Sequence, residues 1–494
     1  MYLLGLDLGS SSVKASIVDS RSGRSIALVQ YPDNEMNIIS KERNWAEQDP
    51  AEWWKNVKLA IKLAISKAGI SNVGIQAIGI SYQMHGLVLI DNDHEVLRPS
   101  IIWCDSRAID IGEKAFVTLG SSFCLENYLN SPGNFTASKL KWVKDNEPDI
   151  YKKAKYAMLP GDYINLCLTG EINTTISGLS EGVFWNFKED KLATKLFDLY
   201  ELDVALIPEI VDSSAIQGKI KPKVAEELGL SDNVFVTYRA GDQPNNAMSL
   251  GVLEAGEVAA TGGTSGVIYG VSDKKIWDSK SRINSFAHVN HNVQSDSIGI
   301  LLCINGAGSL YAWLRKQITG SDLTYKDIEK MIQIVPIGSD ELRILPFGNG
   351  SERMLNNSNN GAQVNNLLFN KHTAAHLFRA GLEGIAFSFV YGFDLLKELG
   401  FAPKKIKVGN DNLFQSDVFS TTVSTLLNLP IEISETTGAI GAAKASGVAI
   451  GAFKNFKEAI GENLQLKLIE PNGQKAVYSN AYKLWLQDLQ LQNQ

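Results

Sequence analysis

Two aspartates, Asp7 and Asp242, could form the pair of carboxylates that phosphoryl transfer uses. Asp7 ends an apolar run before a turn of small residues, and Asp242 lies in "YRAGDQPNNAMSLG", shortly before a second turn of the same kind. One carboxylate can take the proton of a hydroxyl as it attacks a phosphate, and the other can hold Mg²⁺ directly or through water. Local roles compete with this interpretation, because Asp242 could cap a helix and Asp7 could bond to its own turn.

The two small-residue turns are "DLGSSSVK" and "TGGTSG". The first separates apolar runs at residues 2–8 and 13–18, and the second lies within "EVAATGGTSGVIYGV", residues 257–271. Glycine lets backbone N–H groups approach an anion closely, and the hydroxyls add donors, so both turns suit phosphate. Each turn alone is also explained as a tight hairpin. Their repetition about 250 residues apart indicates two similar halves with a cleft between them.

Two other stretches place chemically useful side chains next to apolar runs. In "GISYQMHGLVLID", residues 79–91, the turn at 83–86 contains only one good turn former, Gly86. Met84 and His85 could face a ligand at this turn, or the turn could be an irregular connection with a buried methionine and a surface-exposed histidine. In "WCDSR", residues 103–107, Trp103 and Asp105 could give an aromatic wall and hydrogen-bonding groups for a polyol, or a strand end with a structural ion pair.

Several classes of protein are disfavoured by the composition. A net charge of −7 and a pI near 5.6 disfavour a nucleic-acid partner. The four cysteines have no CxxC spacing and the six histidines stand in no recognised ligand pattern, so neither a disulfide framework nor a zinc site is expected. There is no GxxxxGK[ST] motif and no apolar run of about 18 residues. We therefore expect a cytoplasmic protein without a membrane partner.

The pattern of elements predicts an α/β fold with mixed sheets. Asp49 and Pro50 open the amphipathic segment "WWKNVKLAIKLAI", a predicted helix, and "VGIQAIGIS" follows as a strand. In the second half, "YKDIEKMIQIV" and "AAHLFRAGLEGIAFSFVYGFDLLKEL" are predicted helices and "KIKVG" a strand, whereas residues 347–366 are predicted to form a surface loop. A chain of 494 residues exceeds the usual size of one core, so we divide it into domains at 1–248 and 249–494.

In the order "LGLDLGSSSVK", "ISYQMHGLVLID", "IIWCDSR", "LPGDYINLCLTGE", "RAGDQPNNA" and "GGTSG", the sequence resembles the FGGY family of carbohydrate kinases, and "QMHG" with "LRPSIIWCDSR" is most similar to its xylulokinase members. The resemblance runs over nearly the whole chain. It implies the fold of the sugar kinase, Hsp70 and actin superfamily: two domains with ribonuclease-H-like cores, and ATP and the sugar in the cleft between them. It also implies a kinase that uses ATP and Mg²⁺ and acts on a ketopentose, D-xylulose above all.

The resemblance assigns roles to particular residues. It implies that Asp242 is the general base and that Asp7 lies near Mg²⁺ and the sugar, so both are candidate metal ligands. It also implies that Met84 and His85 contact the ketopentose, since a cleft-facing turn would let His85 bond to hydroxyls and Met84 line an apolar side. Trp103 and Asp105 are further candidate sugar contacts. The candidate nucleotide contacts are Ser11, Lys14, Gly263, Thr264, Gly308, Gly409 and Asn410.

The chain departs from the family pattern in three stretches. A glycine-rich loop beside the adenine is replaced by "VGNDNLFQSD", residues 408–417, the Gly-Glu-Arg-Thr-Pro loop by "GSERMLN", and Ser-Asp-Ala-Ser by "SGLS", residues 177–180. These departures keep two alternatives open: a kinase for another polyol, keto sugar or sugar acid, and a nucleotide- or sugar-binding homologue without turnover. A homodimer is the ordinary expectation for the oligomeric state.

Overall fold

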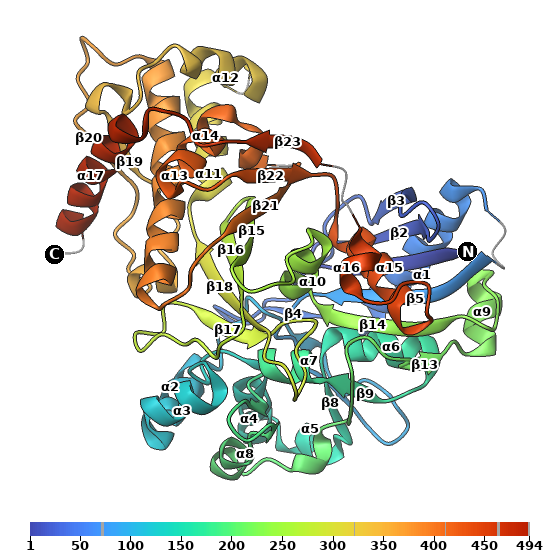
Figure 1. The fold of residues 1–494 in the computed structure, drawn as a ribbon. Helices are drawn as coiled ribbons and strands as arrows, with labels where there is room; N and C mark the ends of the chain where they lie inside the picture. The colour runs from blue at the N-terminus through green and yellow to red at the C-terminus, as the bar shows by residue number, and fades with distance from the viewer. Residues whose placement is uncertain (71–73, 321, 411, 462–464, 493–494) are drawn as a thin grey trace.

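The computed structural model describes residues 1–70, 74–320, 322–410, 412–461 and 465–492, and it contains two large mixed β-sheets (Figure 1). The six strands of the first sheet lie in the order β13 (Gly218–Lys219), β14 (Phe235–Gly241), β5 (Ile75–Tyr82), β1 (Tyr2–Leu8), β2 (Val13–Asp19) and β3 (Ser25–Tyr31). β1, β5 and β14 are parallel to one another, whereas β1, β2 and β3 form an antiparallel meander.

The second sheet repeats this topology. Its seven strands lie in the order β17 (Asn284–Ala287), β18 (Ile298–Ile304), β16 (Gly266–Ser272), β15 (Glu257–Gly262), β21 (Lys405–Gly409), β22 (Ile431–Ser434) and β23 (Gln465–Ile469). β15, β16 and β18 form the antiparallel meander, and β15, β21 and β22 are parallel. The duplicated ribonuclease-H-like core and both small-residue hairpins are thus confirmed.

Two helices cover opposite faces of the first sheet. Leu4 and Leu6 share a core cluster with residues of α1 (Pro50–Ala68), whereas Gly5 of the same strand faces α15 (Gly438–Ala449). Alternate residues of a strand point to opposite faces, so the sheet lies between the two helices. The predicted start of α1 is confirmed, because the Asp49 side chain accepts a hydrogen bond from the backbone N–H of Ala51.

Helix α15 comes from the second half of the sequence but packs on the sheet of the first half. It approaches the strands closely because small residues meet: a Cβ added to Gly79 would lie 2.0 Å from the Ala442 carbonyl oxygen. Between the sheets lies α10 (Asp242–Ser249), which contacts strands of both (Figure 1). The division of the chain near Ser249 stays a prediction.

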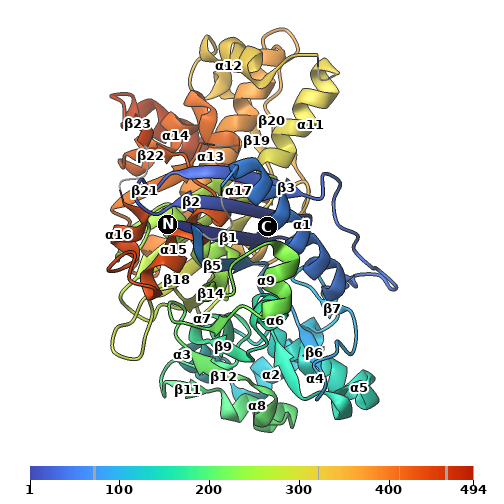
Figure 2. The ribbon, with the colours of Figure 1, turned by 90° about the vertical axis from the view of Figure 1, so that its right-hand side faces the viewer.

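Two helices predicted from sequence lie beside the second sheet: α13 (Ala374–Glu398) packs against β16 and β18, and α12 (Tyr325–Gln333) packs against α13. Figure 2 shows these helices above the first sheet and a smaller lobe below it. Further helices of the upper part are α11 (Ala307–Thr319), α14 (Asp417–Leu427) and α17 (Lys475–Gln492), whereas α16 (Phe456–Ile460) packs against α15. The predicted surface loop at 347–366 also contains a 3₁₀ turn, Arg353–Leu355, and a short strand, β20 (Gln363–Asn365), paired with β19 (Arg343–Leu345).

The lower lobe is built from the segment between β5 and β13. Its helices are α2 (Ile109–Leu119), α3 (Ser121–Tyr128), α4 (Thr136–Asn146), α5 (Pro148–Lys153), α6 (Pro160–Thr169), α7 (Ile176–Glu181) and α8 (Thr194–Tyr200), and α9 (Pro222–Leu228) follows β13. Its short strands are β6 (Val88–Ile90), β7 (Ser100–Ile101), β8 (Tyr156–Met158), β9 (Asn173–Thr175), β10 (Trp185–Asn186), β11 (Lys191–Leu192) and β12 (Glu209–Val211), and β7 pairs with β4 (Glu47–Gln48).

The apolar core cluster around Met84 combines residues from both halves of the sequence. It contains Met84 and Phe135 from the first half together with Tyr269 and Phe286 from the second. All four cysteines carry free thiols. Within the part of the chain that the structure describes, no helix has both the length and the apolar character needed to cross a membrane.

Candidate active site

Asp7 is held at the end of β1 by the strands on either side of it. It pairs with Lys14 on β2 and with Ser81 on β5, and the Ser81 hydroxyl donates a hydrogen bond of 2.8 Å to the Asp7 carboxylate. Burial among the strands raises the pKa of Asp7, although the Ser81 hydrogen bond and the Lys14 charge act in the opposite direction. Asp7 is therefore a partly buried, hydrogen-bonded carboxylate and not a solvated turn residue.

Asp242 reaches the same edge of the sheet from β14. It is the first residue of α10, and β14 lies beside β5, the neighbour of β1. Burial raises the pKa of Asp242 to about 7, and the nearby Asp7 carboxylate adds to the shift. The amide groups of Gln243 partly offset this rise in the pKa. A carboxylate with this pKa can both accept and release a proton near neutral pH.

The two carboxylates border one cavity of about 260 Å³. Five residues singled out from sequence meet there, and Ser12 and Gly9 complete the wall of the first hairpin. The five are Asp7, Ser11, Lys14, Trp103 and Asp242. Sequence reasoning did not single out Ser10 and Gln83, which also line the cavity, although both lie inside motifs that it quoted. All the lining residues fall within positions 7 to 242 of the sequence, so the first half of the chain forms the cavity at the edge of the first sheet.

Met84 and His85 form the turn after β5 but lie beyond the lining of this cavity. Met84 is 4% exposed and belongs to the shared core, against Gly241: a Cβ on Gly241 would lie 2.6 Å from the Met84 Cγ. His85 is partly buried, with its ring near Phe135 and Phe286. Burial lowers the pKa of His85 to about 3, so its imidazole is neutral. The alternative expectation of a buried methionine is met, whereas that of a surface histidine is not.

The two candidates of "WCDSR" differ in exposure. Trp103 is 53% exposed, borders the cavity and lies with its Nε1 3.5 Å from the Ser10 hydroxyl. Asp105 is fully buried: its carboxylate accepts a 2.6 Å hydrogen bond from the Ala46 backbone and forms an ion pair with Arg107. The structural ion pair considered as the alternative is therefore present at Asp105. A contact between Asp105 and a sugar stays a prediction.

The candidate nucleotide residues of the second half gather at the second hairpin. The N–H of Gly308 donates a 2.9 Å hydrogen bond to the carbonyl of Gly263, and that of Ser309 donates to Thr264, so the start of α11 rests on the turn. A side chain at 308 would not fit, because its Cβ would lie 2.5 Å from the Gly263 oxygen. The N–H groups of Gly308 and Ser309 are thus used by the hairpin, and the positive end of the 13-residue helix dipole points toward this turn.

Gly409 and Asn410 lie beside this hairpin, because β21 pairs with β15. Gly409 ends β21, and the exposed Asn410 donates its backbone N–H to Ser434. Leu413 of the following turn packs on Gly262. Asp411, part of the unusual loop at 408–417, lies outside the described residues.

Two buried ionisable residues escaped the sequence analysis. Glu181 is 1% exposed, and burial raises its pKa well above the usual value, with the Asp242 charge as the next cause. Lys139 on α4 is fully buried, and burial lowers its pKa to about 7. Neither stands in a recognised motif: Glu181 directly follows "SGLS", and Lys139 has the spacing of an ordinary helix residue.

The cavity fits a divalent cation with a phosphate. Mg²⁺ is commonly held by one or two carboxylates, with waters and substrate phosphates completing the shell. The Asp7 charge raises the pKa of Asp242, and a cation between the two carboxylates would relieve that repulsion. Among the described residues no group of three or more His, Cys, Asp or Glu could hold a metal by itself. The donor set thus suits an ion that arrives with a nucleotide.

The fold and the paired carboxylates define a phosphotransferase with two ribonuclease-H-like halves. Residues 2–249 match the N-terminal domain of the FGGY family of carbohydrate kinases, and residues 258–450 match its C-terminal domain. The chain belongs to this family and is an ATP-dependent carbohydrate kinase.

Known relatives agree with this assignment. A xylulose kinase of Bacillus subtilis is 28% identical over 467 residues, which cover 92% of this chain and 90% of that one. A xylulose kinase of Lactococcus lactis is 28% identical over 98% of this chain and 96% of its own. A crystal structure of a "xyloylose kinase" from Brucella ovis superposes with a TM-score of 0.89 at 26% identity, covering 99% of both chains. A gluconate kinase from Lactobacillus acidophilus has the same TM-score at 23% identity, covering 100% of this chain and 98% of its own, which shows the fold alone.

Proposed function

We propose that this kinase transfers the γ-phosphate of ATP to the terminal hydroxyl of a ketopentose, converting D-xylulose to D-xylulose 5-phosphate. The observation that carries the proposal is Asp242, whose pKa of about 7 suits a general base and which faces the same cavity as Asp7 and the first hairpin. The names of the relatives favour D-xylulose. Since a gluconate kinase shares the fold, another polyol, keto sugar or sugar acid is the alternative.

The reaction begins when Asp242 accepts the proton of the sugar hydroxyl. The hydroxyl oxygen then forms a bond to the γ-phosphorus as the bond from that phosphorus to the β,γ-bridging oxygen breaks, and ADP leaves with those electrons. Asp7 and Asp242 would hold Mg²⁺, which supplies positive charge for the phosphate oxygens. Ser81 and Lys14 keep the Asp7 carboxylate in place and favour its ionised form.

The nucleotide would extend from the first hairpin to the second. Ser11 and Lys14 border the cavity and are available to phosphate oxygens. The second hairpin with the start of α11 offers a further anion site, and Gly409 and Asn410 lie next to it on β21. We propose that the two halves approach each other around these phosphates, which would exclude water and limit ATP hydrolysis.

On the sugar side, Trp103 would form an exposed wall of the cavity and His85 would hydrogen-bond to a sugar hydroxyl from the adjoining turn. Met84 and Asp105 would support the site indirectly. Met84 packs against Gly241, the residue before Asp242, and Asp105 holds the segment that carries Trp103 in place.

The test is ADP release with Mg·ATP across D-xylulose, L-xylulose, D-ribulose, L-ribulose, gluconate, glycerol and no sugar. We expect a rate selective for D-xylulose that Asp242→Asn abolishes and that Asp232→Asn, at an exposed position, leaves unchanged. Selective turnover of another sugar would retain the mechanism and reject D-xylulose. Silence with every sugar, while nucleotide still binds, would reject catalysis and favour a binding protein.

A further inference from the structure

Lys139 is a buried cation with a specific pair of acceptors. It lies on α4, and its ammonium donates hydrogen bonds of 2.9 Å to the backbone carbonyls of His85 and of Ile102. Burying an ammonium group is costly, and an apolar residue would fill the same space without that cost. The two hydrogen bonds are therefore the feature that the lysine provides and an apolar residue would not.

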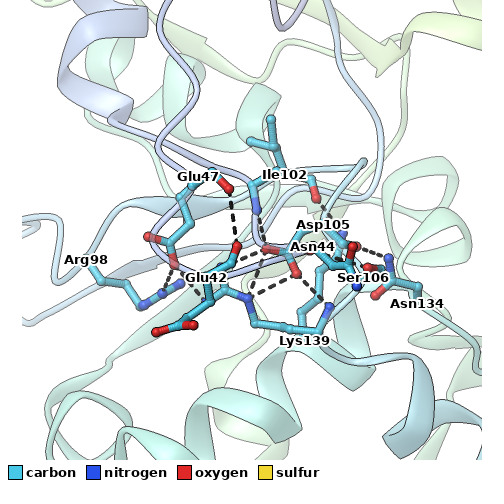
Figure 3. Close-up of polar contacts among 12 residues, drawn as sticks. Glu42, Asn44, Glu47, Arg98, Ile102, Asp105, Ser106, Asn134 and Lys139 are labelled. Atoms are coloured by element: carbon cyan, nitrogen blue, oxygen red, sulfur yellow. Dashed lines mark hydrogen bonds and ion pairs between the residues drawn. The ribbon is translucent and has the colours of Figure 1, made fainter.

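These bonds connect two segments that sequence analysis associated with sugar. His85 belongs to the turn at 83–86, and Ile102 directly precedes Trp103 (Ile102 and Lys139 are labelled in Figure 3). The ionisable groups that face Lys139 come from several elements: Cys104, Asp105 and Arg107 from the segment after β7, and Glu181 from the end of α7. Lys139 thus fixes the distance between the turn and the tryptophan segment.

The same contacts determine how His85 presents its ring. Its Nδ1 lies 2.8 Å from the backbone carbonyl of Glu181. A carbonyl only accepts, so Nδ1 carries the proton, and in the neutral ring Nε2 has the free lone pair. Among the described residues none pairs with Nε2. The backbone φ of His85 is +62°, a left-handed conformation that favours few side chains, so the turn needs outside support to keep this ring direction.

We propose that Lys139 is a positioning residue for the sugar: it holds the 83–86 turn so that Nε2 of His85 accepts a hydrogen bond from a sugar hydroxyl. The proposal rests on the proposed function and refines its site. It assigns the direction of the hydrogen bond, since the sugar must donate. A substrate analogue that lacks this hydroxyl, or carries fluorine in its place, would lose the contact.

The kinetic test compares Lys139→Met and Lys139→Gln with Lys444→Met. Lys444 is the matched control, because it is also buried and donates to one backbone carbonyl, that of Ile460, away from the turn. We expect Lys139→Met to raise the KM for the sugar about three- to tenfold, the effect of one hydrogen bond, with little change in kcat or in the KM for ATP. Lys139→Gln, which keeps a donor, should recover part of the affinity. An unchanged sugar KM, or an equal rise in both KM values, would overturn the proposal.

A second measurement holds even where these variants fold poorly. In wild-type protein with ¹⁵N-labelled histidine, the signals of His85 are assigned by their loss in His85→Asn, since Asn tolerates positive φ. We expect the neutral Nδ1–H tautomer from pH 6 to 8 and a shift of the Nε2 resonance on addition of sugar. An Nε2–H tautomer, or a charged ring, would overturn the proposal. The tautomer is read without turnover, so this outcome is separate from a failure of the sugar panel.

Discussion

The pKa of Asp242 leads to a quantitative prediction for the pH dependence of the kinase. The ratio kcat/KM for the sugar reports ionisations of the free enzyme, in which burial and the Asp7 charge set the pKa of Asp242 at about 7. A base with this pKa is ~9% ionised at pH 6 and ~91% ionised at pH 8, so kcat/KM should rise about tenfold over that interval. The sign follows from the role: a general base works only in its ionised form.

The assay is coupled ADP release at subsaturating sugar and constant ionic strength. Asp7→Asn provides an internal check, because removing the Asp7 charge removes one cause of the raised pKa and should move the midpoint of residual activity to lower pH. Higher Mg²⁺ should move the wild-type midpoint in the same direction if both carboxylates hold the ion. A flat profile from pH 6 to 8, or a midpoint that Asp7→Asn leaves in place, would refute Asp242 as the titrating base.

Three further predictions concern residues around the site. Gly79→Ala should lower stability by about 1 to 3 kcal/mol in denaturant unfolding, as overpacking does, because its Cβ would lie 2.0 Å from the Ala442 oxygen; unchanged stability would contradict the tight helix–sheet contact. Glu181→Gln should raise the melting temperature at pH 7 but not at pH 4. The pKa of Glu181 is raised in the folded protein, so ionising this buried carboxyl costs stability only at pH values above its unfolded pKa. An equal gain in melting temperature at both pH values would reject this cause. Trp103→Ala should raise the KM for the sugar with little change in melting temperature, since the side chain is half exposed; a large loss of stability would reject its role as a cavity wall.

The parts of the site that sequence could predict are those built by local patterns. An apolar run, a small-residue turn and a second apolar run form a hairpin from neighbouring residues, so Asp7 was placed correctly near the end of β1 and the serine turn between β1 and β2. The sequence linked Asp242 to Asp7 only because each aspartate lies near a small-residue turn. The parallel pairing of β14 with β5 is what brings Asp242 to the sheet edge where Asp7 lies. The coincidence of both carboxylates in one cavity is a long-range consequence of strand order.

Met84 shows where local reasoning reaches its limit. The resemblance implied a sugar contact, which stays a prediction, and the structure buries Met84 in a core cluster that contains residues of both halves. An apolar side chain in a turn can face a ligand or a distant segment of the chain, and only the tertiary fold separates these cases. Lys139 and Glu181 were missed for the same reason, since their burial depends on partners far away in sequence.

Helix α15 belongs to the second half of the sequence but packs on the sheet of the first half, a contact that local sequence patterns do not predict. Its residues are small on all sides, so it carries no amphipathic signal, yet Gly5, Gly79 and the helix fit together at contact distance. Its first residue, Gly438, lies against the site: a Cβ there would be 2.6 Å from the Asp7 carboxylate. A segment from the end of the second half therefore completes the wall behind a carboxylate of the first. A movement of α15 relative to the first sheet would therefore change the packing against the Asp7 carboxylate, whereas a movement of both together would leave that packing unchanged.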